Sequence, residues 1–581
     1  MANSSRPTWM RIFIEYAVPH RWSFLAGAIC LLLTNWLTVM IPVELGKGID
    51  SLSDTASVER AAWTIAAMGL GIIVVRTLSR VLFFNPGRDI EYRLRKDLFA
   101  HLLSLQPAFY SGKRTGDIVS RASNDITWTR AMVGFGLMQV VNTTLAIVLT
   151  GWKMIDISWQ LTLYSLIPIV IALFVVQIFI KQLFTLQKRS QEQLGAISDH
   201  VLSSFQGVAT IQGFGAEPAF IERLETKNDA WLRTTMRLAV IRSLAFPLLS
   251  FSGGAAVFVL LYIGAPMALN NELSVGEIAA FATLIGALLP PLRSLGWMMS
   301  VLQRGQAALE RIFELMDSAI DRPEGENPVI SERGKGPSIE VRNLQFAYPD
   351  DPERVVLKDL NFDMPAGAVI GVFGRTGSGK STLLNVLARL YDPRPGMVFV
   401  DGEDINHLDR HSWRERMAVA PQRPFLFSES IAGNIGLGSD AVSEQIVSAA
   451  HKASLMTDLE ALPDGIDTVV GQRGIMLSGG QRQRVALARA LIRNADLVLL
   501  DDVLSAVDHG TEQLLVDSLR SAGRDRKVAP TIVIVSHRIS ALRHADSIIV
   551  MDEGEVSAQG THDELLLKDG PYRDIWEVQS T

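Results

Sequence analysis

The first part of the chain alternates between long apolar stretches and polar segments. Six of the stretches come close to the roughly 20 residues that a helix needs to cross a bilayer. They cover residues 22–43, 62–84, 131–152, 160–180, 244–269 and 278–302. Buried helices of a large soluble protein would be the alternative, but six runs of this length favour membrane spans. The pattern predicts an α-helical six-span membrane domain over residues 1–316.

The polar segments between the predicted spans differ in length and charge. Short segments join spans one to two, three to four and five to six, whereas the other two connections are long and rich in Lys and Arg. Positive charge accumulates on the cytoplasmic side of membranes, so both long segments, the N-terminus and the second half of the chain are predicted to be cytoplasmic. The helical spacing of apolar residues in both long segments indicates that the spans continue into the cytoplasm. We expect a multi-pass protein of a bacterial inner membrane.

A few polar residues interrupt the apolar spans. Four of them fit either hydrogen bonds between helices, which we favour, or the lining of a substrate path: Asn35, Asn142, Thr143 and Thr144. An arginine inside a span suggests function by default. For Arg76 we expect a structural pairing, and Arg293 fits either a pairing or a polar cavity.

Composition changes near residue 320. Residues 317–337 are polar and contain Pro323, Pro328 and Pro337, which indicates a linker. From residue 338 to 581, apolar runs typical of buried strands alternate with helical patterns, so this region is predicted to be an α/β domain.

One short motif in the second domain, the P-loop pattern, indicates phosphate binding. It fits G-x-x-x-x-G-K-[ST], follows an apolar strand and precedes a helical pattern, and consists of Gly374, Arg375, Thr376, Gly377, Ser378, Gly379, Lys380, Ser381 and Thr382. Successive backbone N–H groups and the helix N-terminus bind phosphate oxygens. Lys380 is predicted to reach the β- and γ-phosphates, and the Ser381 hydroxyl to bind Mg²⁺. An accidental glycine-rich turn would be the alternative, but the strand and helix around the motif disfavour it.

Two further segments fit the same chemistry. The apolar strand 497–501 ends in Asp501, a carboxylate placed to support Mg²⁺ at the phosphates. Before it, Ser478, Gly479, Gly480 and Gln481 precede a helix predicted over 482–492, which makes a second anion-binding helix start.

The Leu-Ser-Gly-Gly-Gln segment between a P-loop and an apolar strand ending in Asp resembles the signature of ATP-binding cassette (ABC) proteins. With six spans before one cassette, the chain resembles a type IV exporter half-transporter of the multidrug and lipid-exporter class. The resemblance implies an ABC-type P-loop NTPase domain that uses ATP and Mg²⁺. It also implies roles for single residues: Tyr348 stacks on adenine, Gln422 lies near the metal and the attacking water, Asp508 belongs to the D-loop, and His537 contacts the γ-phosphate. A histidine without this context is more often structural.

In this family two cassettes close head to tail, and each ATP lies between one P-loop and the partner's signature segment. The resemblance therefore implies a second half-transporter as partner. Here the signature contribution comes from Ser478, Gly479, Gly480 and Gln481, and the metal set is Ser381, Gln422 and Asp501.

One residue departs from the family pattern. Asp502 stands where active sites of this family usually have the glutamate that polarises water. Its carboxylate is withdrawn by roughly 1 Å, which in a reaction controlled by positioning costs on the order of 100-fold. We therefore expect a heterodimer in which this chain's P-loop, Asp501 and Asp502 form a slow site. A homodimer in which Asp502 works remains the alternative.

Charge and cysteine content add little. A net charge of −6 gives no reason to expect a nucleic-acid partner, and the one cysteine allows no internal disulfide. The largely apolar path suits lipophilic or amphipathic cargo, so drugs, lipids, peptides and siderophores all stay open. A nucleotide-gated channel or a regulatory ATPase is the alternative to a transporter, while an anchored kinase and an importer fit the motifs and domain order less well.

Overall fold

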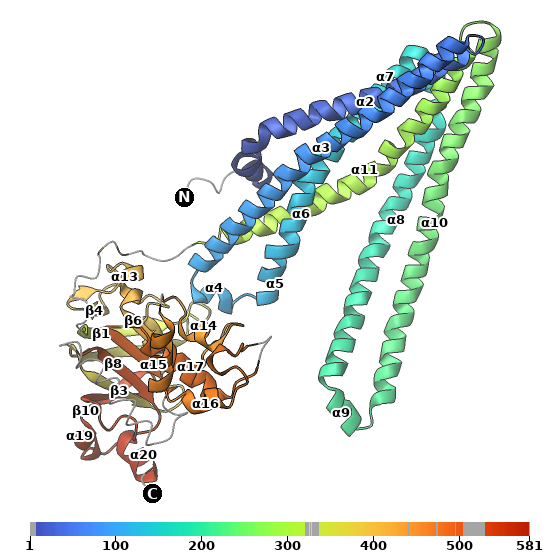
Figure 1. Cartoon of the computed structure of the whole chain (residues 1–581). Coiled ribbons are helices and arrows are strands. Elements are labelled where there is room, and N and C mark those ends of the chain that lie inside the picture. Colours follow the sequence, from blue (N-terminus) through green and yellow to red (C-terminus); the bar gives the residue numbers. More distant parts are fainter. Residues whose placement is uncertain are drawn as a thin grey trace. The chain divides into compact units, whose positions relative to one another are not determined.

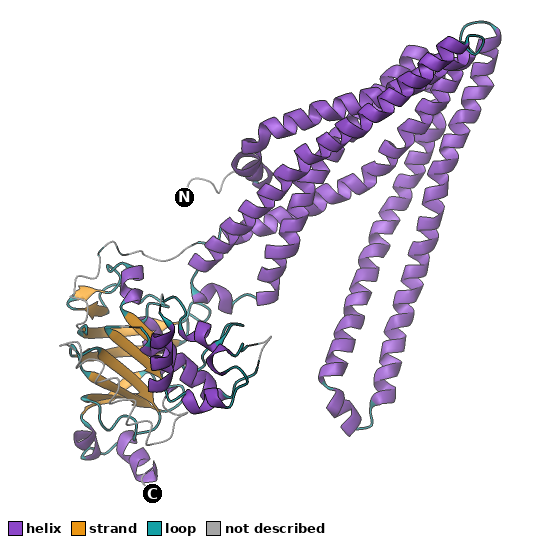
Figure 2. Cartoon of the chain, in the orientation of Figure 1, coloured by secondary structure: helices purple, strands orange, loops and turns teal. Residues whose placement is uncertain are grey.

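The computed structural model describes residues 7–319, 325, 327, 336–439, 441–471, 475–493, 495–503 and 529–579. It divides into two compact units. One contains residues 1–103 and 116–318, and the other contains residues 104–115 and 319–581. Figure 2 shows that the first unit is helical and that the strands belong to the second.

The helical unit contains the predicted spans within much longer helices. Among the described residues, six helical segments are long and apolar enough to cross a membrane. The helices are α1 (Thr8–Arg11), η1 (Ile12–Ala17), η2 (Val18–His20), α2 (Arg21–Asp50), α3 (Thr55–Ser104), α5 (Thr115–Ser120), η3 (Arg121–Asp125), α6 (Ile126–Ala131), η4 (Met132–Gly136), α7 (Leu137–Ile157), α8 (Trp159–Gln206), α9 (Val208–Gly213), α10 (Glu217–Leu269) and α11 (Val275–Met316). The predicted extension of the spans into long helices is confirmed, since α3, α8, α10 and α11 have 50, 48, 53 and 42 residues.

Polar residues inside the spans join neighbouring helices. The Asn35 amide of α2 donates to the side-chain oxygen of Asn142 on α7 at 3.0 Å. Thr143 of α7 lies 3.3 Å from the Ser294 hydroxyl of α11. These contacts agree with the predicted role in holding helices together. Arg76 is exposed, and among the described residues no ion pair joins it to another side chain, so the structural pairing expected for it stays a prediction.

Contacts near both ends of α11 tie it to neighbouring helices. At its start, Gly276 lies against Gly46 of α2 so closely that a Cβ would collide with the Gly46 carbonyl. The Gly276 N–H also donates to Asp50 Oδ1 at 2.7 Å. Only glycine permits this separation between the two helices.

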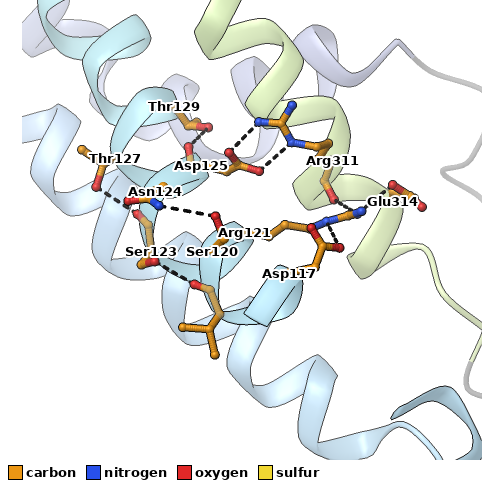
Figure 3. A network of polar contacts seen from close by, with 11 residues as sticks. Asp117, Ser120, Arg121, Ser123, Asn124, Asp125, Thr127, Thr129, Arg311 and Glu314 are labelled. Atoms are coloured by element: carbon orange, nitrogen blue, oxygen red, sulfur yellow. Dashed lines mark hydrogen bonds and ion pairs between the residues drawn. The ribbon is translucent and has the colours of Figure 1, made fainter. Parts of the chain in front are cut away.

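At its other end, α11 is joined to η3 by ion pairs, and η3 is paired in turn with α5 (Figure 3). Arg311 binds Asp125 with two hydrogen bonds of 2.8 and 2.6 Å. Arg121 pairs with Asp117 at 2.9 Å and with Glu314 at 2.7 Å. Asp125 is 5% exposed, so its charge depends on Arg311 for compensation. The network fixes the last turns of α11, which lead toward the linker.

The second unit is built on a six-stranded sheet in the order β10-β9-β3-β8-β7-β6, beside a four-stranded sheet in the order β2-β1-β4-β5. The strands are β1 (Ile339–Ala347), β2 (Val355–Met364), β3 (Val369–Gly374), β4 (Val398–Val400), β5 (Glu403–Asp404), β6 (Met417–Ala420), β7 (Leu497–Asp501), β8 (Thr531–Ser536), β9 (Ser547–Asp552) and β10 (Glu555–Gly560). The helices are α4 (Pro107–Ser111), α12 (Lys380–Leu387), α13 (Arg410–Glu415), α14 (Ile431–Ile435), α15 (Ser443–Lys452), α16 (Met456–Glu460), η5 (Gly465–Asp467), α17 (Gly479–Leu491), α19 (His562–Leu566) and α20 (Pro571–Gln579).

The central strands of the six-stranded sheet are buried on both faces. In β8, Ile532 and Ile534 belong to one hydrophobic core, whereas Val533 and Val535 belong to another. Strands β3, β7 and β8 are fully buried, as expected of parallel strands covered on both sides. Figure 1 shows helices α15 and α17 beside this sheet. The predicted α/β character of this part of the chain is confirmed.

Candidate nucleotide site

The parallel strands bring the predicted site residues to one edge. β3 pairs with β8, β8 with β7, and β7 with β6, all in parallel. Their carboxyl ends therefore lie at the same side of the sheet, where α/β proteins bind ligands. The P-loop follows β3, Asp502 follows β7, His537 follows β8 and Gln422 lies just beyond β6.

A cavity of about 610 Å³ lies at this edge. It is lined by the P-loop, by Gln422, Asp501, Asp502 and His537, and by an aromatic pair. The lining residues are Ser111, Tyr348, Asp350, Asp351, Arg354, Val356, Thr376, Gly377, Gly379, Lys380, Ser381, Thr382, Tyr391, Gln422, Asp501, Asp502, Val535 and His537. A volume of this size is typical of small-molecule sites.

The P-loop depends on glycine at two positions. Gly377 and Gly379 have φ angles of 90° and 96°, which residues with a Cβ rarely adopt. A Cβ on Gly379 would also come within 2.7 Å of Leu357 Cδ2. This backbone lets α12 begin at Lys380, directly after the turn.

Lys380 is folded over the loop that it follows. Its Nζ donates to the carbonyl oxygens of Gly374 and Arg375, both at 2.7 Å, and approaches Ser378 Oγ at 3.4 Å. Burial lowers the pKa of the Lys380 ammonium, and the charges of Asp501 and Asp502 oppose that shift. A phosphate group would supply the negative charge that this buried ammonium lacks.

The neighbouring carboxylate suits a metal ion. Burial raises the pKa of Asp501 and the charge of Asp502 adds to the shift, while a hydrogen bond from Ser381 acts against it. Ser381, Asp501 and Gln422 offer hydroxyl, carboxylate and amide oxygens, which are ligands that Mg²⁺ accepts. Within the described ranges, no group of three or more His, Cys, Asp or Glu side chains is arranged to hold a metal ion. The residues therefore fit a Mg²⁺ that is held partly by nucleotide phosphates.

Asp502 lies at the centre of a polar trio. Its backbone has a φ of 52°, and its N–H donates to the Val535 carbonyl at 2.9 Å. His537 Nδ1 lies 2.9 Å from Asp502 Oδ1, and Gln422 Nε2 donates to Asp502 Oδ2 at 3.4 Å. With an ionised carboxylate, Nδ1 carries the hydrogen and Nε2 is left for another partner. The Gln422 amide oxygen likewise stays available for a metal or water.

An aromatic pair also lines the cavity. Tyr348 and Tyr391 meet edge to face with centroids 5.1 Å apart, and the Tyr348 hydroxyl lies 2.9 Å from Thr382 Oγ1 on α12. Sequence reasoning found Tyr348 but missed Tyr391. The local signal is weak, because Tyr391 follows a helix and is brought beside Tyr348 by the tertiary fold. Ser111 was missed for the same reason, whereas Asp350, Asp351 and Arg354 follow Tyr348 closely in the chain but belong to no recognised motif.

Comparison with known proteins agrees with this geometry. Residues 24–292 match the family model described as ABC transporter transmembrane region, and residues 357–505 match the one described as ABC transporter. The chain is 33% identical over 579 residues to the multidrug resistance-like ATP-binding protein MdlA of Escherichia coli, covering 98% of this chain and 97% of that protein. The chain is an ABC transporter.

Other relatives support the same assignment. The chain is 32% identical over 566 residues to the probable multidrug resistance ABC transporter ATP-binding/permease protein YheI of Bacillus subtilis, covering 95% of this chain and 94% of that protein. It is also 32% identical over 494 residues to the ATP-dependent lipid A-core flippase of Photobacterium profundum, covering 84% of this chain and 83% of that protein. The predicted six-span domain followed by an ABC ATPase domain is thus confirmed, as is transport coupled to ATP hydrolysis.

The signature segment of this ABC transporter caps α17. Ser478 Oγ accepts from the Gln481 N–H at 3.2 Å, and Gln481 Oε1 accepts from the Ser478 N–H at 2.9 Å. This reciprocal cap lets the helix begin at Gly479, three residues before the predicted start. Asp458 holds the segment from α16, since Gln481 and Arg484 donate to it at 3.3 and 2.7 Å.

The signature residues are not part of the P-loop cavity. Among the described residues that line it, none comes from 478–481. Gln483 connects α17 to the segment after β6, because its Nε2 donates to the Gln422 carbonyl at 3.1 Å. The predicted D-loop residue Asp508 lies outside the described residues.

Proposed function

We propose that this ABC transporter exports lipophilic or amphipathic substrates across a bacterial inner membrane, as one half of a dimer. The named relatives are described as multidrug resistance proteins and lipid A-core flippases, which supports cargo of this class. The N-terminus and the ATPase unit are placed in the cytoplasm, on the basis of the basic connections between spans.

The observation that carries the proposal is the separation of two phosphate-binding elements. The P-loop lines the cavity, whereas the capped start of α17 does not. Both are built to bind anions, one through Lys380 and the loop backbone, the other through Ser478 and a helix N-terminus. A second cassette arranged head to tail would bring its α17 to this P-loop, so the site is complete in a dimer.

Within the site we assign the following roles. Tyr348 stacks on adenine, and the P-loop from Gly374 to Thr382 holds the phosphates with Lys380 as the cation. Ser381, Asp501 and Gln422 hold Mg²⁺, which when bound neutralises phosphate charge. Asp502 orients the attacking water, and His537, whose Nδ1 is bound to Asp502, presents Nε2 to the γ-phosphate.

Asp502 supports an asymmetric heterodimer. Its carboxylate lines the cavity but is already held by His537 and Gln422, and a glutamate here would extend one methylene farther toward a water. We propose that this site hydrolyses ATP slowly while Ser478 to Gln481 complete a faster site in the partner. A homodimer with a working Asp502 is the alternative.

Coupling to the membrane is assigned to the short helices of the two long connections. α9 joins α8 to α10, and beside it Phe205 and Phe214 are 72% and 85% exposed. α4 belongs to the ATPase unit, and its last residue, Ser111, lines the nucleotide cavity. Closure of two cassettes would therefore move these helices and, through α3, α8 and α10, the spans.

Transport in proteoliposomes tests the proposal. The purified chain, alone and together with a candidate partner half-transporter, is reconstituted with a fluorescent amphipathic substrate. ATP should drive accumulation against a gradient, and Lys380→Ala combined with alanine at the partner's equivalent P-loop lysine should abolish it. ATP-dependent flux that only dissipates a gradient would instead show a nucleotide-gated channel. Full cooperative turnover by this chain alone would show a homodimer.

A further inference from the structure

The C-terminal helix reaches the loop that carries His537. Gln579, the last residue of α20, receives a hydrogen bond on Oε1 from the Ile539 N–H at 3.0 Å. Its Nε2 donates to the His537 carbonyl oxygen at 3.0 Å. The partners fix the orientation of the amide, because a backbone N–H can only donate and a carbonyl can only accept. One side chain thus brackets the loop directly after β8.

The helix that presents Gln579 is anchored on the P-loop strand. Tyr572 of α20 is 2% exposed and packs edge to face on Phe373, with centroids 5.2 Å apart. Phe373 directly precedes the first P-loop residue. Tyr572 Oη also lies 2.8 Å from His562 Nδ1, and the Trp576 ring lies 4.9 Å from the His562 ring. The position of Gln579 is therefore set relative to the phosphate-binding loop.

Apart from Gln579, the loop after β8 is held firmly at Ile539 and less firmly at His537. Ile539 is fully buried in the core. The His537 side chain, in contrast, is 54% exposed and lies against Asp502. The hydrogen bond to the His537 carbonyl holds the backbone at the residue whose ring must point into the cavity.

We infer that Gln579 is a positioning residue for ATP hydrolysis, which acts by fixing the backbone from which His537 reaches the nucleotide. Gln579 does not line the cavity and so makes no direct contribution to ATP binding. The inference rests on the role proposed above for His537. Loss of the Gln579 side chain should lower the rate of hydrolysis and leave the affinity for ATP nearly unchanged, because misplacement of a catalytic group lowers the rate.

The first test uses the complete transporter in lipid nanodiscs. Hydrolysis of bound ATP is followed in single turnover, which reports this site even if it is slow. Gln579→Ala should lower the rate about five-fold with an ATP Kd within about two-fold of wild type. Gln559→Ala is the control, because Gln559 is an exposed glutamine of β10 whose amide donates to Ser547 at 3.4 Å. It should leave both quantities unchanged. A rate for Gln579→Ala equal to that of the control would overturn the inference.

A second variant separates positioning from general damage. In Gln579→Glu the ionised carboxylate can still accept the hydrogen bond from the Ile539 N–H, but it cannot donate one to the His537 carbonyl oxygen. The protonated carboxylic acid can do both. The rate relative to wild type should therefore rise as the pH falls from about 8 to about 5.5, toward the range in which a glutamate takes up its proton. A flat ratio would contradict the inference, even if the thermal stability of Gln579→Ala were reduced.

A double-mutant cycle decides whether the effect passes through His537. In a His537→Ala background, Gln579→Ala should have no further effect, because the residue being positioned is gone. Additive losses would overturn the inference. If His537→Ala itself retained the full rate, the role proposed for His537 would fail, which is a result distinct from failure of the Gln579 bracket.

Discussion

Lengthening Asp502 should speed hydrolysis at this site. In Asp502→Glu one methylene is added to a side chain whose carboxylate is now held by His537 at 2.9 Å and Gln422 at 3.4 Å. The carboxylate would advance by roughly 1 Å toward the cavity, and a misplacement of that size is worth on the order of 100-fold in rate. That factor corresponds to about 2.7 kcal/mol of activation free energy.

Backbone strain at position 502 opposes this gain, but its free energy is smaller than the gain in activation free energy. Asp502 has a φ of 52°, a region in which Asp and Asn are enriched among residues other than glycine. Placing glutamate there adds strain of about 0.5–1 kcal/mol to the folded state. Asp359 shares the same φ of 52° on the other sheet and does not line the nucleotide cavity. Asp359→Glu is therefore a matched control for the strain alone.

The assay is single-turnover hydrolysis in the reconstituted transporter, with the thermal midpoint measured in parallel. Asp502→Glu and Asp359→Glu should lower the midpoint similarly, and only Asp502→Glu should raise the rate, by about 10- to 100-fold. Asp502→Asn, which keeps the size and removes the charge, should lower it. A rate for Asp502→Glu within about two-fold of wild type, with both glutamate variants folded, would refute the argument that reach limits this site.

Three further predictions concern Lys380, Tyr348 and the ion pairs of α11. Burial lowers the pKa of Lys380, so its ammonium loses its proton at a lower pH than an ordinary lysine, and the affinity for ATP should fall as the pH rises through that pKa. Binding titrations between about pH 7 and 10 should show this fall for the wild type and not for Lys380→Arg. Parallel curves for the two proteins would count against the prediction. Tyr348→Ala should raise the KM for ATP about ten-fold, as expected for loss of base stacking. Tyr348→Phe loses the hydrogen bond to Thr382 but keeps the ring, so its KM should stay within about two-fold of the wild-type value. Equal effects of the two variants would argue against stacking. Arg311→Ala leaves the buried Asp125 carboxylate without its bidentate partner and should destabilise the chain by about 2 kcal/mol, less than for a fully buried pair because Arg311 is half exposed. Thermal unfolding should show this loss of stability, and combining Arg311→Ala with Asp125→Asn should recover part of it. The control is Arg573→Ala, which breaks exposed ion pairs with Asp569 and Glu577 and should change the stability little.

Local sequence patterns predicted the elements of this protein well. The spans, the strand before the P-loop and the strand ending in Asp501 follow from apolar runs, because burial in lipid or in a parallel sheet demands continuous hydrophobic segments. Motifs of consecutive residues were also visible, since the proposed phosphate site is formed by the backbone of one loop. The start of α17 was misplaced because Gly479 and Gly480 are poor helix formers, and the reciprocal cap between Ser478 and Gln481 overrides that preference.

The sequence by itself therefore determined which segments are apolar enough to cross a membrane, which loop has the phosphate-binding pattern and which carboxylates follow one strand. Only the tertiary structure placed Tyr391 beside Tyr348, tied Asp125 to Arg311 and brought Gln579 to the backbone of His537. These contacts join residues that are 43, 186 and 42 positions apart, as the numbering shows. Hydrophobic periodicity carries information about neighbours on one helix or strand, whereas such pairs depend on how whole elements pack, and no local pattern records that.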